Sequence, residues 1–363
     1  MRRWGRTKKC RVGFIGLGHV SQACHLPGYE GVENVEVVAG AELREDVLRR
    51  ISSEWGFRGY TSYEEMLRRE DLDIACVTVG PRFSREVTER AAEHGVNVLV
   101  EKPMALTLED ARSMIAKCER EGVKLCYGET YRFLPACRRA KGMIDEGALG
   151  DLLLLMETVI GGRGPEHFRF YHIYPDGAPG SGGMGLIDHG IHLVDVFRWF
   201  AGSPVEWVFG RGNRVGRPPG TEFLTMKFKS GAIGQLVYNE ATYPSDMPHE
   251  GIFSWGSYWA QGKPGWDPHP RDFRVHGTKG ALRIFPYANK MFLFAEGRQE
   301  QVRLPDSPHP HHFGLQIESF ARSVLNDEEP EVTGVDGLKT LQIILAAYES
   351  YENQKIVKIK PVI

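Results

Sequence analysis

Residues 11–21 of the chain read RVGFIGLGHVS. An apolar, β-favouring run leads directly into glycines at positions 16 and 18. Gly16 permits a tight turn, and Gly18 lets the backbone approach a pyrophosphate group closely. Ser21 stands where a third glycine is usual, and the following helix would direct its positive dipole end at the phosphates. The stretch therefore predicts a dinucleotide-binding turn at the end of a parallel strand.

A second strand and the residues after it indicate which dinucleotide binds. Residues 35–41 form a β-favouring run that ends at Glu42, about 20 residues beyond the glycine turn, where a carboxylate can bind the ribose hydroxyls of NAD. Arg44 lies close by and could instead bind the 2′-phosphate of NADP. Because the carboxylate of Glu42 would repel that phosphate, the sequence favours NAD, with NADP as the alternative.

Further strand-like runs follow at residues 73–79, 97–101 and 125–128, separated by helical periodicity. Thr107 is suited to precede a helix, with Asp110 in the capping-box position. Alternating strands and helices are typical of an α/β fold with a doubly wound parallel sheet. The sequence thus predicts an N-terminal Rossmann domain over residues 1–128.

The run at residues 97–101 ends abruptly in Glu101, Lys102 and Pro103. Its valines and leucine suit a parallel strand that is buried on both faces. Lys102 is therefore expected at the carboxyl end of a buried strand, where open α/β sheets bind their ligands. The hypothesis is a catalytic cation beside the cofactor; the alternative is an ordinary surface lysine. The predicted cofactor-binding residues are Gly16, Gly18, His19, Val20, Glu42, Arg44, Thr78, Glu101 and Lys102.

Beyond residue 128 strand-like segments follow one another with few helices between them. They are residues 152–159, 205–211, 223–229, 232–238, 273–276 and 281–285. Several alternate polar and apolar residues, and residues 229–231 are typical of a hairpin turn. This pattern predicts a second α/β domain over residues 129–334 with a large, open, mostly antiparallel sheet. A last helix, about 335–352, is expected to pack back onto the first domain.

A predicted helix at residues 187–200 carries a second set of chemically active side chains. On a helix, Asp188 and His192 are i,i+4 neighbours. Histidine suits proton transfer near neutral pH, so the pair can act as an orienting carboxylate and a general base. The alternative is a solvated polar face. His309, His311 and His312 are interrupted by proline and have no suitably spaced carboxylate or cysteine, so no metal site is expected.

Aromatic residues cluster at 243–266, among them Trp255, and at 168–172, which includes His172. Aromatic faces suit pyranose rings, and the alternative is a subunit interface. The 363-residue length suggests two domains. A net charge of −2 gives no reason to expect nucleic acid or an anionic membrane as a partner. No apolar run is long enough to span a membrane, the basic N-terminal segment does not read as a signal peptide, and scattered cysteines fit a cytoplasmic protein.

With these motifs in place, the chain resembles the glucose–fructose oxidoreductase/inositol dehydrogenase (Gfo/Idh/MocA) family. The resemblance is carried by the glycine turn with His25 and Pro27, by residues 101–103, by Gly128 with residues 132–133, and by residues 188–195. It implies that Lys102, Asp188 and His192 line a site between the domains, that Lys102–Pro103 is a cis peptide, and that the second domain often mediates oligomerisation. The expected substrate-binding residues are Tyr131, Arg132, His172, Asp188, His192 and Trp255.

Two departures from the family pattern affect the substrate rather than the cofactor. Residues 80–84 read GPRFS where Pro-Asn-x-x-His is frequent, and Glu129 and Thr130 stand where His-Asn is frequent. The expected function is an NAD(P)-dependent oxidoreductase acting on a secondary alcohol of a sugar, polyol or glycoside, with sugar C3 as one option. The alternatives are an inositol dehydrogenase-like enzyme, an NAD-dependent glycoside-cleaving enzyme using a keto intermediate, and a non-catalytic NAD- or sugar-binding sensor. A homo-oligomer (dimer, tetramer or larger) is expected.

Overall fold

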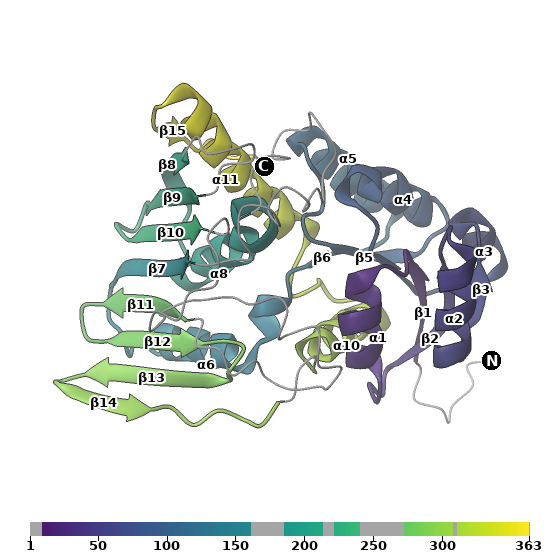
Figure 1. Cartoon of the computed structure of the whole chain (residues 1–363), viewed down its shortest axis with the longest axis horizontal. Coiled ribbons are helices and arrows are strands. Elements are labelled where there is room, and N and C mark those ends of the chain that lie inside the picture. Colours follow the sequence, from purple (N-terminus) through teal and green to yellow (C-terminus); the bar gives the residue numbers. More distant parts are fainter. Residues whose placement is uncertain (1–8, 161–184, 213–220, 240–271, 308–310, 363) are drawn as a thin grey trace. The chain divides into compact units, whose positions relative to one another are not determined.

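The computed structural model describes residues 9–160, 185–212, 221–239, 272–307 and 311–362. The chain forms two compact units, shown in Figure 1. The first comprises Met1–Glu129 and Pro310–Leu338, and the second comprises Thr130–His309 and Lys339–Ile363.

The first unit contains a six-stranded sheet with the order β3-β2-β1-β4-β5-β6. Every neighbouring pair is parallel. All four residues of β4 are buried, as expected for a strand covered on both faces. The predicted doubly wound Rossmann sheet is confirmed. Its strands are β1 (Cys10–Ile15), β2 (Val35–Ala41), β3 (Arg58–Tyr60), β4 (Ile74–Val77), β5 (Asn97–Glu101) and β6 (Leu125–Gly128).

Helices cover both faces of this sheet (Figure 1). They are α1 (Leu26–Tyr29), α2 (Glu45–Trp55), α3 (Tyr63–Arg69), α4 (Pro81–Glu93), α5 (Leu108–Glu121) and α10 (His311–Asn326). One core unites apolar side chains of β1 with those of α1, α2 and α10. The predicted cap of α5 is present, because Thr107 Oγ1 accepts the Asp110 N–H at 3.0 Å.

The second unit contains a nine-stranded sheet with the order β14-β13-β12-β11-β7-β10-β9-β8-β15. Only the β7–β10 pair is parallel, so the prediction of a mostly antiparallel sheet is confirmed. The strands are β7 (Leu152–Ile160), β8 (Val205–Gly212), β9 (Thr221–Phe228), β10 (Ile233–Asn239), β11 (Phe273–Gly277), β12 (Ala281–Phe285), β13 (Lys290–Ala295), β14 (Arg298–Gln301) and β15 (Val357–Lys358).

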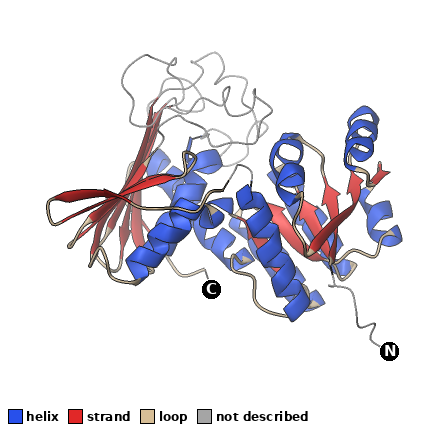
Figure 2. Cartoon of the chain, turned by 90° about the horizontal axis from the view of Figure 1, so that it is seen from below, coloured by secondary structure: helices blue, strands red, loops and turns tan. Residues whose placement is uncertain are grey.

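Helices lie against one face of the nine-stranded sheet, as Figure 2 shows. They are α6 (Pro135–Asp145), α8 (Ile191–Ala201) and α11 (Gly334–Asn353). The approach of α11 to β8 is so close that a Cβ on Gly210 would lie 2.3 Å from the Ala347 carbonyl oxygen. Glycine is therefore required at this point of the strand. A hydrogen bond from Gly210 N to Ser350 Oγ at 3.0 Å joins the same elements.

The expectation about the last helix differs from the observed structure. α11 is a helix, but from Lys339 onward it belongs to the second unit. The helix that returns to the first unit is α10, whose Ile317 and Phe320 are fully or almost fully buried in the Rossmann core. Helix α10 was not predicted; residues 311–312, whose histidines were not expected to bind a metal, are its first two residues. The strands β3, β13, β14 and β15 and the helix α6 were not predicted either.

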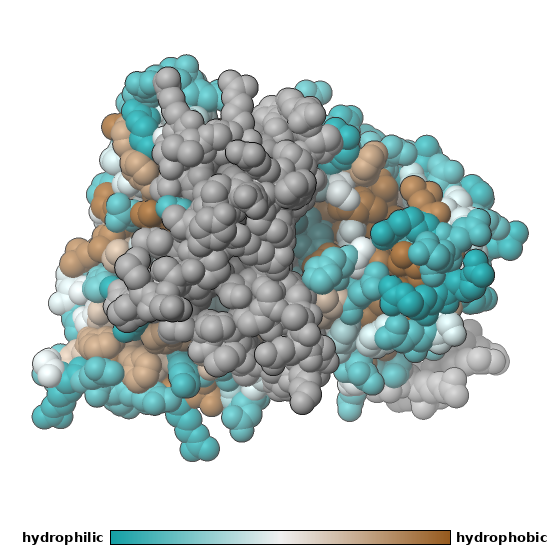
Figure 3. All heavy atoms as spheres, viewed as in Figure 1, coloured by the Kyte–Doolittle hydropathy of each residue, from teal (hydrophilic) through white to brown (hydrophobic). Residues whose placement is uncertain are grey.

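On the face shown in Figure 3, polar and charged residues alternate with small apolar patches among the residues described. In the described part of the chain, no helix combines the length and apolar character needed to cross a membrane. All six cysteines are free thiols in buried positions.

Candidate functional site

The carboxyl ends of the parallel strands bring the predicted cofactor-binding residues to one edge of the first unit. Ile15 pairs with Ala41 and with Val77, and Val77 pairs with Val100. The residues that follow these strand ends therefore share the edge at which open α/β sheets bind ligands. They include Gly16, Glu42, Thr78 and Lys102.

The glycine turn has the backbone geometry that its sequence predicts. Gly16 has φ +95°, and a Cβ there would lie 2.9 Å from the Thr78 carbonyl oxygen. At Gly18 no atom lies within 4 Å of the position a Cβ would take, so open space adjoins the backbone. This is the arrangement that the close approach of a pyrophosphate requires, and the turn therefore fits a dinucleotide.

Two hydroxyl groups hold this turn from beneath. Thr78 Oγ1 donates to Gly16 O at 2.7 Å, and Ser21 Oγ donates to the same oxygen at 2.9 Å. Both side chains are buried. Ser21, which stands in place of the usual third glycine, therefore stabilises the turn through its hydroxyl group. Thr78, predicted to contact the cofactor, instead directs its hydroxyl at the turn's backbone.

Glu42 reaches back from the end of β2 to the glycine turn. Its Oε2 accepts the Leu17 N–H at 3.1 Å, and its Oε1 accepts Arg44 Nε–H at 3.0 Å. Burial alone would raise the pKa of this carboxyl, but the hydrogen bonds from Arg44 and Leu17 outweigh it and hold the pKa below its usual value. The carboxylate is therefore ionised at neutral pH and fixed beside the turn.

Glu101 and Lys102 are adjacent in the chain but differ in how deeply they are buried. Lys102 is half-buried at the sheet edge, whereas Glu101 is 8% exposed. Glu101 Oε1 lies 2.7 Å from His25 Nε2, and Oε2 accepts the Lys102 backbone N–H at 2.9 Å. Both carboxylate oxygens of Glu101 therefore have partners within the protein, and its predicted cofactor contact stays a prediction. The predicted cis Lys102–Pro103 peptide is confirmed.

Asp188 and His192 lie at the start of the main helical segment of the second unit. Asp188 falls in a π-helical turn, Gly185–Gly190, and His192 lies in the first turn of α8. The two residues therefore lie on two successive helical segments, of which the first has a wider repeat than the regular helix that was expected. The His192 ring stacks on Tyr131 with centroids 4.3 Å apart and planes 7° apart. The Tyr131 hydroxyl is bonded in turn to that of Tyr287.

Two buried acids support this helical segment and were missed in the sequence. Glu157 is 2% exposed; it contacts the Tyr238 hydroxyl and lies 3.4 Å from His189 Nε2. Glu222 is 3% exposed and accepts the Leu186 N–H at 3.1 Å. One signal was available: in β7 the alternation places Glu157 on the same face as Leu155 and Val159, where a charge is unusual.

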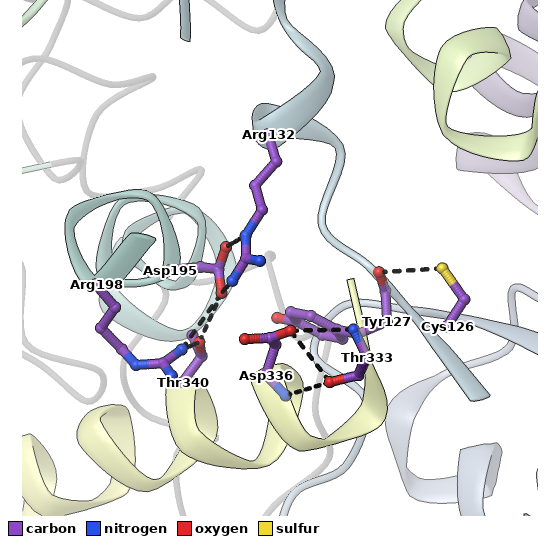
Figure 4. Close-up of polar contacts among 8 residues, drawn as sticks. All are labelled: Cys126, Tyr127, Arg132, Asp195, Arg198, Thr333, Asp336 and Thr340. Atoms are coloured by element: carbon purple, nitrogen blue, oxygen red, sulfur yellow. Dashed lines mark hydrogen bonds and ion pairs between the residues drawn. The ribbon is translucent and has the colours of Figure 1, made fainter. Parts of the chain in front are cut away.

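Arg132, predicted to bind substrate, belongs to a buried ion-pair cluster (Figure 4). Its Nε and Nη2 donate to the two oxygens of Asp195 at 2.6 and 2.8 Å. Asp195 is fully buried and also accepts from Thr340 and Arg198. The guanidinium thus holds α8 in place, and the predicted substrate contact of Arg132 stays a prediction.

The remaining predicted residues divide into two groups. His19 is exposed and Val20 half-buried beside the glycine turn, consistent with a place at the cofactor. His172, Trp255 and His309 lie outside the described residues. Among the described residues, no group of three or more histidine, cysteine or acidic side chains is arranged to hold a metal ion.

The glycine turn and the ionised acid after β2 fit a Rossmann domain that binds a dinucleotide. Residues 10–129 match the oxidoreductase family with an NAD-binding Rossmann fold, and residues 141–359 match that family's C-terminal α/β domain. The chain belongs to this Gfo/Idh/MocA oxidoreductase family.

Curated relatives span nearly the whole chain. D-apiose dehydrogenase of Paraburkholderia graminis is 27% identical, covering 98% of this chain and 91% of its own length. Myo-inositol 2-dehydrogenase of Thermotoga maritima is 26% identical, covering 97% and 99%. The aldose-aldose oxidoreductase of Caulobacter crescentus is similar in fold, with a TM-score of 0.80, 24% identity and coverage of 97% and 100%.

Proposed function

We propose that the protein is an NAD-dependent dehydrogenase that oxidises a secondary alcohol of a sugar or cyclic polyol. The observation that carries this proposal is that an open glycine turn, an ionised Glu42 and Lys102 follow the carboxyl ends of strands at the same edge of the Rossmann sheet. A non-catalytic sensor would need the glycine turn and Glu42 but would have no use for the lysine.

The choice of NAD over NADP is supported by the pairing of Glu42 with Arg44. Two guanidinium nitrogens of Arg44 donate to the Glu42 carboxylate. The arginine is therefore largely neutralised, although its side chain is 60% exposed. A 2′-phosphate would meet a carboxylate as well as a cation, whereas ribose hydroxyls can donate to the same carboxylate.

The chemistry divides among three side chains, and bound NAD supplies the acceptor for a hydride. His192 takes the proton of the substrate hydroxyl as the carbon–hydrogen bond breaks and the carbonyl forms. The ammonium of Lys102 donates a hydrogen bond to the oxygen as negative charge develops on it. Asp188 orients His192 or accepts a neighbouring hydroxyl.

A hydroxyl-rich ring as substrate is supported by two kinds of evidence. The parallel stacking of Tyr131 on His192 gives the general base an apolar neighbour and a defined ring plane. In addition, the curated relatives act by name on D-apiose, on inositols and, in Actinomadura kijaniata, at position 3 of a dTDP-linked keto sugar. The last of these extends the proposal to C3 of a sugar.

The test is a substrate panel followed at the absorbance of reduced nicotinamide. It contains myo-inositol, scyllo-inositol, D-apiose, free aldoses and a β-glucoside, each with NAD and with NADP. Turnover of at least one ring hydroxyl with NAD is expected. Cleavage of the glucoside without net reduction would instead support the transient-oxidation alternative, and binding without turnover on any substrate would support the sensor.

Two variants test the assigned roles on the best substrate. Lys102→Met should lower kcat by about 10²- to 10³-fold, since an oxyanion-stabilising donor is lost. His192→Gln should lower kcat by about 10²-fold, since the proton acceptor is lost. Both should retain binding of NADH by fluorescence. The matched controls are Lys124→Met, at a partly exposed ion pair with Asp327, and His276→Gln in β11. Near-normal kcat in Lys102→Met would contradict the proposal.

Self-association is proposed as well. The face of the nine-stranded sheet opposite its buried side chains carries half-buried apolar residues, including Met156, Phe223, Val237 and Phe292. Apolar side chains on the outer face of a sheet favour association. Light scattering should therefore give a mass that is a multiple of 40.9 kDa, and Phe223→Asp should lower it. A monomeric wild-type protein would contradict this proposal.

A further inference from the structure

A buried histidine, His25, contacts Glu101, the residue that precedes the lysine of the proposed site. His25 is fully buried at the end of the π-helical turn Ser21–His25. Its Nε2 lies 2.7 Å from Glu101 Oε1, and its Nδ1 lies 3.1 Å from the Tyr29 hydroxyl. The Tyr29 hydroxyl in turn lies 3.2 Å from Cys76 Sγ. Both ring nitrogens of His25 are therefore engaged inside the first unit.

The packing around His25 fixes the plane of its ring. Phe14 of β1 meets it edge-on at 6.1 Å between centroids, and Phe313 of α10 meets it edge-on at 4.8 Å. Helix α10 approaches α1 closely, since a Cβ on Gly314 would lie 2.3 Å from the Gly28 carbonyl oxygen. The ring is thus enclosed by segments from both ends of the sequence, which leaves little freedom to turn away from Glu101.

Glu101 connects His25 to the backbone of Lys102 at the edge of the sheet. One carboxylate oxygen bonds His25 and the other accepts the backbone N–H of Lys102. A buried carboxylate is costly unless its oxygens are satisfied. Burial acts to raise the pKa of Glu101, but the hydrogen bond and charge of His25, with Lys102 nearby, outweigh it and lower the pKa. The carboxylate therefore remains charged, with a preference for a partner at each oxygen.

We propose that His25 is a positioning residue for Lys102. His25 fixes the carboxylate of Glu101, and this carboxylate in turn accepts the backbone N–H of Lys102. The inference rests on the proposed role of Lys102. Without His25, one oxygen of a buried carboxylate loses its partner, and Glu101 must rotate, take up a proton or admit water. Each of these changes releases the backbone that directs the lysine.

The two nitrogens of His25 allow a matched pair of substitutions. In His25→Gln the side-chain amide reaches about as far as Nε2 and can still donate to Glu101. In His25→Asn the shorter amide lies nearer the position of Nδ1, toward Tyr29, and cannot reach Glu101. Both variants replace the ring with a small polar amide, so the loss of aromatic packing is similar. Phe320→Leu, which truncates a buried side chain of the same core, controls for destabilisation alone.

Three quantities are measured on each full-length variant: kcat on the best substrate, NADH affinity by fluorescence, and the acetylation rate of Lys102 by peptide mass spectrometry. In His25→Asn we expect kcat to fall about 10- to 100-fold, as misplacement of a catalytic group by about 1 Å can cause. NADH affinity should change little, and Lys102 should be acetylated faster. His25→Gln should restore both kcat and the acetylation rate, and Phe320→Leu should lower the melting temperature only.

Two outcomes overturn the inference. One is a folded His25→Asn protein with wild-type kcat and wild-type acetylation of Lys102. The other is an equal fall of kcat in His25→Asn and His25→Gln, in proportion to the fall of their melting temperatures. That result would show that His25 is a purely structural residue. The acetylation rate needs no turnover. It therefore still decides the inference if the substrate panel fails and the proposed function is withdrawn.

Discussion

At the scale of single residues, Glu42 binds the protein's own backbone at the place where a cofactor is expected. It holds the Leu17 N–H of the glycine turn and neutralises Arg44. Its lowered pKa means that the charged form is favoured in the folded protein. Any contribution of this charge to stability or to NAD binding is therefore fully present above the usual carboxyl pKa and is lost as pH falls through the lower, folded value.

The first prediction concerns cofactor preference. Glu42→Ala should raise the KM for NAD about tenfold, the effect of losing a hydrogen bond to a charged group. It should lower the KM for NADP, because Arg44 is released to meet the 2′-phosphate. Glu45→Ala, an exposed acid in the first turn of α2, is the matched control and should leave both values unchanged. Unaltered preference in Glu42→Ala would remove Glu42 from the cofactor site.

At the scale of elements, the position of α8 depends on a buried charge cluster. Asp195 joins α8 to Arg132 of the 3₁₀ turn Thr130–Phe133 and to Thr340 of α11. Figure 4 shows these side chains converging on one carboxylate. From the sequence, Arg132 was expected to bind substrate, and its pairing with Asp195 was not predicted. A separation of 63 residues gives no local pattern, so only the fold could bring them together.

The second prediction follows from that cluster. Asp195→Asn should lower the free energy of unfolding of the second unit by about 3–5 kcal/mol, because it leaves the Arg132 charge buried without its counter-ion. Urea unfolding can be followed by tryptophan fluorescence, to which Trp199 contributes; its ring lies 5.8 Å from Arg132 Cζ. Asp327→Asn, at an exposed ion pair, should leave the transition almost unchanged. Equal effects of the two substitutions would contradict the prediction.

At the scale of the whole molecule, the cysteines report on global folding. All six are buried thiols. Burial raises the pKa of the Cys76 and Cys118 thiols to about 12, so they remain protonated near neutral pH.

The third prediction is that the native protein resists a thiol-specific colorimetric reagent at about pH 8, and that all six thiols react after denaturation. Ser53→Cys, at an exposed position of α2, should react at once and serves as the positive control. Rapid reaction of a native thiol would show that the core around it opens readily.

Local sequence determined much of this protein. The glycine turn, the acid after β2, the Lys-Pro strand end and the cap of α5 each depend on residues close together in the chain. Their backbone or charge requirements can therefore be read directly. Many of the strands, although not β3, β13, β14 or β15, also followed from the pattern of apolar residues, because that pattern is a local property.

Tertiary structure decided what the side chains at those places face. Thr78 donates to the Gly16 carbonyl oxygen, Glu101 bonds His25, Arg132 pairs with Asp195, and α10 packs against His25. The physical reason is the same in each case. A buried polar group bonds to whichever partner the packing brings near it. That partner comes from a segment far away in the sequence, and the local sequence pattern does not indicate that the two segments will meet.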